Sequence, residues 1–316
     1  MRRFVAKSIL FCALFGMLVF CMACLSATER FREVFAYLTE SSDYYAGPED
    51  EVAEYIGFVR EEGDYTRLIV GDSVCNQMLN NMHDRNTEYC IAGNNRALTV
   101  AGEYLLVREF LELHEGITDV YLIIGLDALQ ADIDTTYGYG YVVIPFLRER
   151  MLQNLEEETL DEVEERFGYL FVQRPVAMLV GNSSVNRKLY STYIKDHTPV
   201  VPYTGQIELS NLAATYLVKI NTLCEEYGAV LHLLPDPLAD NESRHIQEEG
   251  LKIDFAVRGL DELFPNYFNE IMFYPDEQFG DGIHFGEPYN EQSVMNEKIR
   301  EMYLDHGYLD GIVLGE

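Results

Sequence analysis

Ser73 is a candidate nucleophile because of the residues on either side of it. Residues 68–70 are apolar and Gly71 follows them, which predicts a short buried strand that ends at the glycine. Beyond Ser73, apolar residues recur at helical spacing from Val74 onward, so a helix is expected to begin at the serine. This position has two interpretations. The serine can cap the helix through its side-chain oxygen, or it can be a nucleophile at the C-terminal edge of a sheet.

A serine nucleophile needs a general base, and the base needs an acid to orient it. Among the seven histidines, His284 is the one with a carboxylate at a suitable spacing. Asp281 lies three residues before it, in the glycine-rich stretch 279–285 that precedes the last expected helix. One loop of this spacing can present both side chains together, so that the carboxylate holds the imidazole.

The elements that must position these residues alternate between apolar strands and helices. Strands are predicted at 67–71, 89–93, 119–125 and 229–235, and helices at 49–61, 101–115, 209–223 and 295–303. Continuous apolar strands that alternate with helices predict an α/β fold with a parallel sheet covered on both faces. In such sheets, ligands bind at the carboxyl ends of the strands, where Ser73 falls.

The N-terminus carries the pattern of a transmembrane helix. Three basic residues in the first seven positions precede an uncharged stretch whose apolar part, 9–27, has 19 residues. A helix needs roughly 20 residues to cross a bilayer, and a basic flank stays cytoplasmic. We therefore expect a retained single-pass anchor rather than a cleaved signal peptide. The chain then divides into a cytoplasmic N-terminus and anchor at 1–28, a juxtamembrane helical segment at 29–63, and an extracytoplasmic domain at 64–316 with an insertion at about 130–205.

The charge balance and the cysteines exclude several classes of function. The chain has 53 acidic and 23 basic residues, a formal net charge of −30 at pH 7. A field of that sign repels nucleic acid, so no nucleic-acid partner is expected. Cys75, Cys90 and Cys224, the cysteines beyond the expected anchor, have neither disulfide-scaffold nor metal-site spacing, so they are expected in the core. No metal or cofactor is expected.

The order of these features resembles the SGNH/GDSL hydrolase superfamily over most of residues 64–306. Gly-Asp-Ser follows the first strand of the domain, and Asp-x-x-His precedes its last helix. The resemblance implies a three-layer, flavodoxin-like parallel sheet, with Ser73 as the nucleophile, His284 as the general base and Asp281 as the orienting acid. It also implies an oxyanion hole formed by the backbone N–H groups of Ser73 and Gly93.

One block of the chain departs from the family's pattern. The family commonly has Gly-x-Asn-Asp where this chain has Gly-Leu-Asp-Ala at 125–128, which places Asp127 where an asparagine donates to the oxyanion. An ionised carboxylate has no donor, and its charge opposes an oxyanion. We therefore expect Asp127 to face elsewhere and Asn94 or Asn95 to supply the missing donor. Asp72 and Asp127 are both candidates for lining the site.

The architecture as a whole is similar to that of accessory proteins of cell-surface O-acylation. That similarity implies an acyl group, acetyl in the simplest case, on Ser73. It is loaded through a membrane-bound O-acyltransferase and discharged onto a hydroxyl of a cell-surface polysaccharide or other polymer. Two alternatives stay open at this point. One is a membrane-tethered esterase that releases the acyl group to water, and the other is a non-catalytic glycan-binding protein on the same fold.

Overall fold

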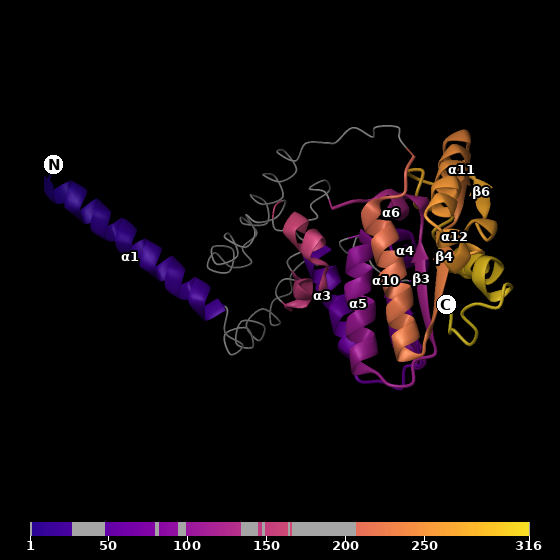
Figure 1. Cartoon of the computed structure of the whole chain (residues 1–316), viewed down its shortest axis with the longest axis horizontal. Helices are drawn as coiled ribbons and strands as arrows, with labels where there is room; N and C mark the ends of the chain where they lie inside the picture. Colours follow the sequence, from indigo (N-terminus) through magenta and orange to yellow (C-terminus); the bar gives the residue numbers. More distant parts are fainter. Residues whose placement is uncertain are drawn as a thin grey trace. The chain divides into compact units, whose positions relative to one another are not determined.

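The computed structural model describes residues 2–26, 48–79, 82–93, 99–133, 145–146, 149–163, 165 and 207–315. The chain divides into two compact units. The first contains helix α1 (Arg2–Ser26), and the second contains the sheet and nearly all of the other described residues (Figure 1).

Helix α1 covers the segment that the sequence predicts as a membrane anchor. Its large apolar side chains are exposed, Phe4, Phe11 and Leu14 among them. Over the part of the chain that the structure describes, no helix combines the length and the apolar character needed to cross a membrane. The transmembrane anchor therefore stays a prediction from the sequence.

Four parallel strands form the main sheet, as the sequence predicts. They are β1 (Arg67–Gly71), β2 (Tyr89–Gly93), β3 (Asp119–Ile124) and β4 (Val230–Pro235), in the order β2-β1-β3-β4. Gly71 at the end of β1 pairs with Gly93 of β2 and with Ile123 of β3, so the carboxyl ends of these strands lie at one edge of the sheet. In an open parallel sheet, that edge is where ligands bind.

Helices connect these strands and surround the sheet. The α-helices of this unit include α3 (Pro48–Arg60), α4 (Ser73–Leu79), α5 (Thr99–Leu113), α6 (Leu126–Gln130), α10 (Asn211–Tyr227), α11 (Glu242–Val257), α12 (Leu260–Leu263) and α13 (Gln292–Ile299). Shorter helical turns are η1 (His83–Arg85), η3 (Met151–Asn154), η4 (Tyr267–Asn269), η5 (Asp276–Gln278) and the π-helical turn η6 (Arg300–Leu304). A second, two-stranded parallel sheet pairs β5 (Leu238–Asp240) with β6 (Phe273–Pro275).

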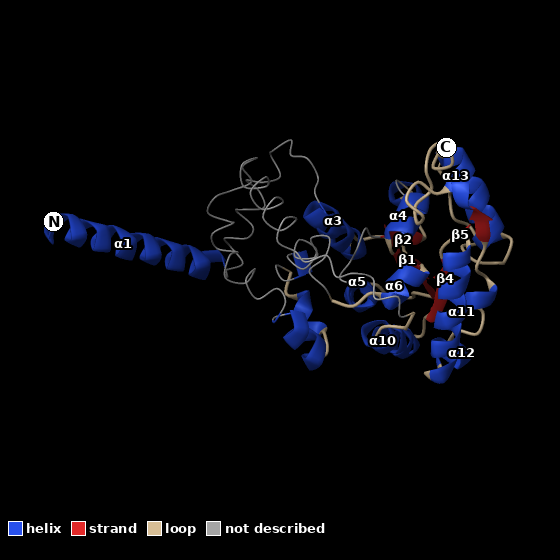
Figure 2. Ribbon diagram, turned by 90° about the horizontal axis from the view of Figure 1, so that it is seen from above, coloured by secondary structure: helices blue, strands red, loops and turns tan. Residues whose placement is uncertain are grey.

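The main sheet is the middle layer of the unit. Successive side chains of a strand point to opposite faces, and on one face Ile69, Ile91 and Ile123 pack in a cluster with Met78 of α4 and Met295 of α13. On the other face, α5 and α10 lie side by side against the strands (Figures 1 and 2). Because both faces are covered, the strands are apolar along their length. The predicted α/β class with a parallel sheet is confirmed. So is the core position of the free cysteines Cys75, Cys90 and Cys224.

Helix α3 packs against α5 and β2 through the buried side chains of Val52, Ile56 and Val59. The sequence analysis assigned 29–63 to a juxtamembrane segment. In the structure, residues 48–63 belong to the unit that contains the sheet. Much of the expected insertion at about 130–205 lies outside the described residues.

Two features near the site, α11 and the β5–β6 pair, go beyond what the sequence pattern predicts. Strands of three residues are too short to show a periodicity, and α11 carries charged residues along most of its length. Its apolar face is narrow, with Leu251 and Phe255 buried. Helix α11 matters for the site because it brings an arginine to the edge of the sheet where Ser73 lies.

Candidate active site

Ser73 is the first residue of α4 and lies at the carboxyl edge of the sheet, two residues beyond the end of β1. The side chain that caps this helix belongs to the preceding residue. The Asp72 carboxylate accepts the backbone N–H of Val74 at 3.0 Å, and the Asp72 carbonyl accepts the N–H of Asn76 at 2.9 Å. The interpretation of Ser73 as the helix cap is therefore wrong, because Asp72 fills that role and leaves the serine hydroxyl for another partner.

That partner is His284. Its Nε2 lies 2.8 Å from Ser73 Oγ, and its Nδ1 lies 2.8 Å from Asp281 Oδ2. The structure thus brings together the three residues that the sequence singles out. In the tautomer with the proton on Nδ1, the Nδ1–H group donates a hydrogen bond to the Asp281 carboxylate. Nε2 then carries a lone pair that can accept the proton of the serine hydroxyl.

Asp281 is held in its ionised form by its own loop. Its Oδ1 accepts the backbone N–H groups of Ile283 at 3.0 Å and His284 at 2.7 Å. Partial burial acts to raise the pKa of Asp281, but the hydrogen bonds from the backbone and side chain of His284 and from Ile283 outweigh it and lower the pKa to about 2. At neutral pH the imidazole therefore faces a carboxylate.

Residues 278–286, here called the His284 loop, form a short hairpin. The N–H of Gly280 donates to the His284 carbonyl at 2.9 Å, and the N–H of Gly286 donates to the Gln278 carbonyl at 2.8 Å. The hairpin is fixed to α4 by Gln77, whose side-chain amide donates to the Phe285 carbonyl and accepts the Phe285 N–H. Sequence reasoning missed Gln77, because nothing in its neighbourhood marks it.

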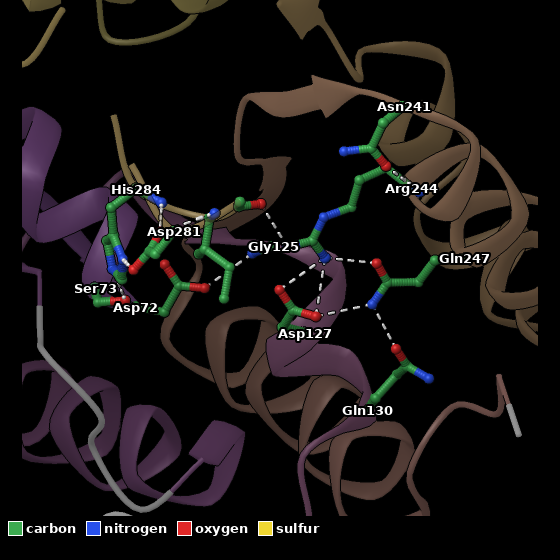
Figure 3. A network of polar contacts seen from close by, with 12 residues as sticks. Asp72, Ser73, Gly125, Asp127, Gln130, Asn241, Arg244, Gln247, Asp281 and His284 are labelled. Carbon is green, nitrogen blue, oxygen red and sulfur yellow. Dashed lines mark hydrogen bonds and ion pairs between the residues drawn. The ribbon is translucent and has the colours of Figure 1, made fainter. Parts of the chain in front are cut away.

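Asp72 also connects β1 to the end of β3. Its Oδ2 accepts the backbone N–H of Gly125 at 3.0 Å (Figure 3). Asp236 packs against the same glycine, since a Cβ at Gly125 would lie 2.9 Å from Asp236 Oδ2. Asp236 is 2% exposed, and its carboxyl group lies beside that of Asp72. Burial and the neighbouring carboxyl of Asp72 raise the pKa of Asp236 well above its ordinary value.

The expected oxyanion donors are placed in part. The N–H of Ser73 belongs to the first turn of α4, where helix N–H groups have no carbonyl partner within the helix. Gly93 ends β2 and packs tightly on α4, because a Cβ there would lie 2.9 Å from Cys75 Sγ and 3.3 Å from the backbone nitrogen of Asn76. Asn94 and Asn95 lie outside the described residues.

Asp127 forms an ion pair with Arg244 of α11. Arg244 Nη1 lies 2.8 Å from Asp127 Oδ2 and donates to its Oδ1 at 3.0 Å, and Gln247 Nε2 donates to the same Oδ1 at 2.9 Å. Figure 3 shows the carboxylate turned toward these partners. Arg244 and Gln247 are site residues that the sequence analysis missed, since neither lies in a recognisable motif.

No protein-family model matches the chain, and no curated protein matches it either. Within the described ranges, no group of three or more His, Cys, Asp or Glu side chains is arranged to hold a metal ion. The chemistry that the arrangement can perform is nucleophilic attack by a serine that is activated by an imidazole and a carboxylate.

Proposed function

We propose that this protein transfers an acyl group, acetyl in the simplest case, to a hydroxyl of a cell-surface polysaccharide or polymer through an acyl-serine on Ser73. The observation that carries the proposal is the 2.8 Å separation between Ser73 Oγ and His284 Nε2, with Asp281 2.8 Å from the other ring nitrogen. A nucleophile, a base and an orienting acid within hydrogen-bond reach are the signature of covalent acyl transfer.

The two half-reactions use the same groups. His284 takes the proton of Ser73 as the hydroxyl attacks the carbonyl of the acyl donor, and it returns that proton to the leaving group. The backbone N–H groups of Ser73 and Gly93 stabilise the oxyanion of each tetrahedral intermediate. His284 then takes a proton from the acceptor hydroxyl, whose oxygen attacks the acyl-serine. As the bond between the acyl carbon and Ser73 Oγ breaks, His284 gives that proton to Oγ, which restores the serine hydroxyl and the neutral imidazole. Asp281 stabilises the imidazolium in both halves.

The ion pair at Asp127 favours a transferase over a plain esterase. A carboxylate engaged by Arg244 supplies no donor to the oxyanion, and the loss of one such donor costs roughly 10²–10³ in rate. An acceptor hydroxyl held beside the acyl-serine offsets this loss, because positioning alone lowers a barrier by several kcal/mol. Water is not positioned in that way, so hydrolysis is the slower outcome.

The proposal includes a place for the protein in the cell. It keeps the anchor that the sequence predicts at residues 1–28, which holds the chain in the membrane with the domain outside the cytoplasm. There the domain receives acyl groups through a membrane-bound O-acyltransferase and meets the surface polymer. A tethered esterase that uses the same acyl-serine is the second candidate.

The experiment is the partition of a labelled acetyl group between water and sugar. The purified protein is given a labelled aryl acetate with and without a panel of surface oligosaccharides. We expect slow release of acetate to water and label on an oligosaccharide in the wild type, and neither in Ser73→Ala. Fast hydrolysis without labelled sugar would favour the esterase. Equal turnover by Ser73→Ala would contradict Ser73 as the nucleophile. The absence of a covalent label on Ser73 with any donor would leave the glycan-binding protein.

A further inference from the structure

We infer that the Asp127–Arg244 ion pair positions the His284 loop, and that Arg244 is a positioning residue for the acyl transfer proposed above. Asp127 stands where the resembled family has an oxyanion donor. In this chain the residue acts on the other side of the site, through an arginine that binds the backbone between the orienting acid and the base. The expected effect on the reactivity of Ser73 rests on the proposed function. The expected effect on the position of the His284 loop does not.

The guanidinium of Arg244 bonds in two directions. Nη1 contacts both carboxylate oxygens of Asp127, at 2.8 and 3.0 Å, while Nη2 donates to the carbonyl of Gly282 at 2.9 Å (Figure 3). Asp127 is at the start of α6, directly after β3, so it belongs to the rigid edge of the sheet. Arg244 therefore connects a fixed point of the sheet to the loop. A planar guanidinium with several donors suits this geometry, which a lysine ammonium cannot reproduce.

The arginine is itself held in place. The side chain of Asn241 caps α11 by accepting the Arg244 N–H at 3.0 Å, which fixes the first turn of the helix. Gln247, one turn later and 4% exposed, accepts from Arg244 Nη1 at 2.6 Å and donates to Asp127. The Arg244 side chain is 12% exposed, so its charge is largely removed from water and depends on Asp127 as its anion.

Gly282 is the point of the loop where this contact has most effect. It lies between Asp281 and His284 and has a φ of +80°, a conformation that side chains with a Cβ rarely adopt. Asp281 holds His284 through hydrogen bonds within the loop, so a displacement of the loop displaces the imidazole with it. Fixing the Gly282 carbonyl fixes where that unit stands relative to Ser73. A displacement of about 1 Å is enough to cost roughly 10²-fold in rate.

The test compares Arg244→Gln, Arg244→Lys and Asp127→Asn with a matched control, Arg258→Gln. Arg258 follows the same helix at its other end and makes the same kind of contacts, with the Asp254 carboxylate at 3.5 Å and the Leu209 carbonyl at 3.0 Å, away from the triad. Two readouts are taken on the full chain. One is hydrogen exchange of a peptide that covers the His284 loop, and the other is the rate at which a fluorophosphonate labels Ser73.

We expect faster exchange in the His284 loop and roughly 10²-fold slower labelling in Arg244→Gln. Labelling of Arg244→Lys should be faster than that of Arg244→Gln but slower than that of the wild type. The lysine keeps a positive charge beside Asp127 but loses the hydrogen bond to the Gly282 carbonyl. Asp127→Asn should have the same effects in weaker form. The double variant Arg244→Gln/Asp127→Asn should be labelled no more slowly than Arg244→Gln alone, because the two residues act as one unit. Arg258→Gln should lower thermal stability while its loop exchange and labelling rate stay at wild-type values.

Unchanged loop exchange in Arg244→Gln would overturn the inference, and so would a loss of labelling in Arg258→Gln as large as that in Arg244→Gln. Failure of the proposed function gives a different result, which is the absence of Ser73 labelling in the wild type. In that case, hydrogen exchange still decides whether the ion pair holds the loop.

Discussion

Gln77 and Phe285 exchange two hydrogen bonds between helix α4 and the loop that carries the base. Gln77 Nε2 donates to the Phe285 carbonyl at 2.9 Å, and the Phe285 N–H donates to Gln77 Oε1 at 3.0 Å. Gln77 lies one turn after Ser73 on the same helix, and Phe285 directly follows His284. The amide therefore sets the separation between nucleophile and base, as the Arg244 contact does from the other side of the loop.

Replacing Gln77 should slow the chemistry more than it lowers stability. Gln77→Leu leaves the Phe285 N–H and C=O without their partners, which costs about 1–3 kcal/mol. It also frees His284 to move away from Ser73, so kcat on an aryl acetate should fall by roughly 10²-fold. Steady-state kinetics and denaturant unfolding on the same preparations measure both effects.

Asn86 is the control for this prediction. Its side chain makes the same two-way contact with the backbone of Val313, at 3.1 and 2.7 Å, and also donates to the Met82 carbonyl. Asn86→Leu should lower the free energy of unfolding by a similar amount and leave kcat close to wild type. A kcat for Gln77→Leu that equals that of Asn86→Leu would contradict a positioning role.

Asp236 should make the protein less stable as the pH rises. Its pKa in the folded state is raised by burial and by Asp72, so between its unfolded pKa, about 3.9, and its folded pKa the native state holds a proton that the unfolded state has lost. The free energy of unfolding therefore falls with rising pH across that window. Asp236→Asn cannot ionise, so its stability should fall less steeply from about pH 4 upward.

Urea unfolding of both proteins at several pH values measures this difference, with the exposed Asp132→Asn as the control that should follow the wild type. Parallel stability curves for wild type and Asp236→Asn would show that Asp236 is ionised in the folded protein at these pH values.

Asp281 should act in the opposite sense at acid pH. Its folded pKa is lowered to about 2, so the stability that it contributes is present above its unfolded pKa, about 3.9, and is lost as the pH falls toward 2. Asp281→Asn lacks this contribution at every pH, and the gap in stability between the two proteins should close below pH 4. At neutral pH the same variant should lose about 10⁴-fold in kcat, because the imidazole is no longer held in the correct tautomer. A stability gap that stays constant down to pH 2 would contradict the shift.

The triad and the sheet could be predicted because their signals are local. Each strand is a mainly apolar run that ends on a glycine or a proline or is followed by one, and Asp281 and His284 are three residues apart. The contacts that fix the geometry are not local. Gln77 and Phe285 are 208 residues apart, and no pattern on either side marks the pair.

The sequence motif around Asp127 predicts which role this residue cannot have, but it does not predict the residue's partner. Its departure from the family's asparagine is visible in the sequence, as is the conclusion that a carboxylate cannot donate to an oxyanion. Its partner is not visible, because Arg244 is 117 residues away on a helix with a weak apolar pattern. The same holds for Asp72, which caps α4 through the N–H of Val74, whereas the sequence pattern offered Ser73 as one possible cap.

The expected anchor predicts how the protein fractionates. The full chain should stay with membranes after an alkaline wash, and its domain should be cleaved by a protease added from outside the cell. A variant that lacks residues 1–28 should lose membrane association and keep the aryl-acetate activity of the purified domain. Recovery of the full chain in the soluble cytosolic fraction would contradict the extracytoplasmic part of the proposal.

The most direct test of the account is the identity of the residue that becomes covalently modified. The wild type, Ser73→Ala and His284→Ala are incubated with a fluorophosphonate, and the adduct is located by mass spectrometry of peptides. We predict one adduct on Ser73 in the wild type, none in Ser73→Ala, and strongly slowed formation in His284→Ala, because Nε2 lies 2.8 Å from the serine oxygen and takes its proton. An adduct that forms equally fast in Ser73→Ala, or a wild type that is not modified, would contradict the assignment of Ser73 as the nucleophile.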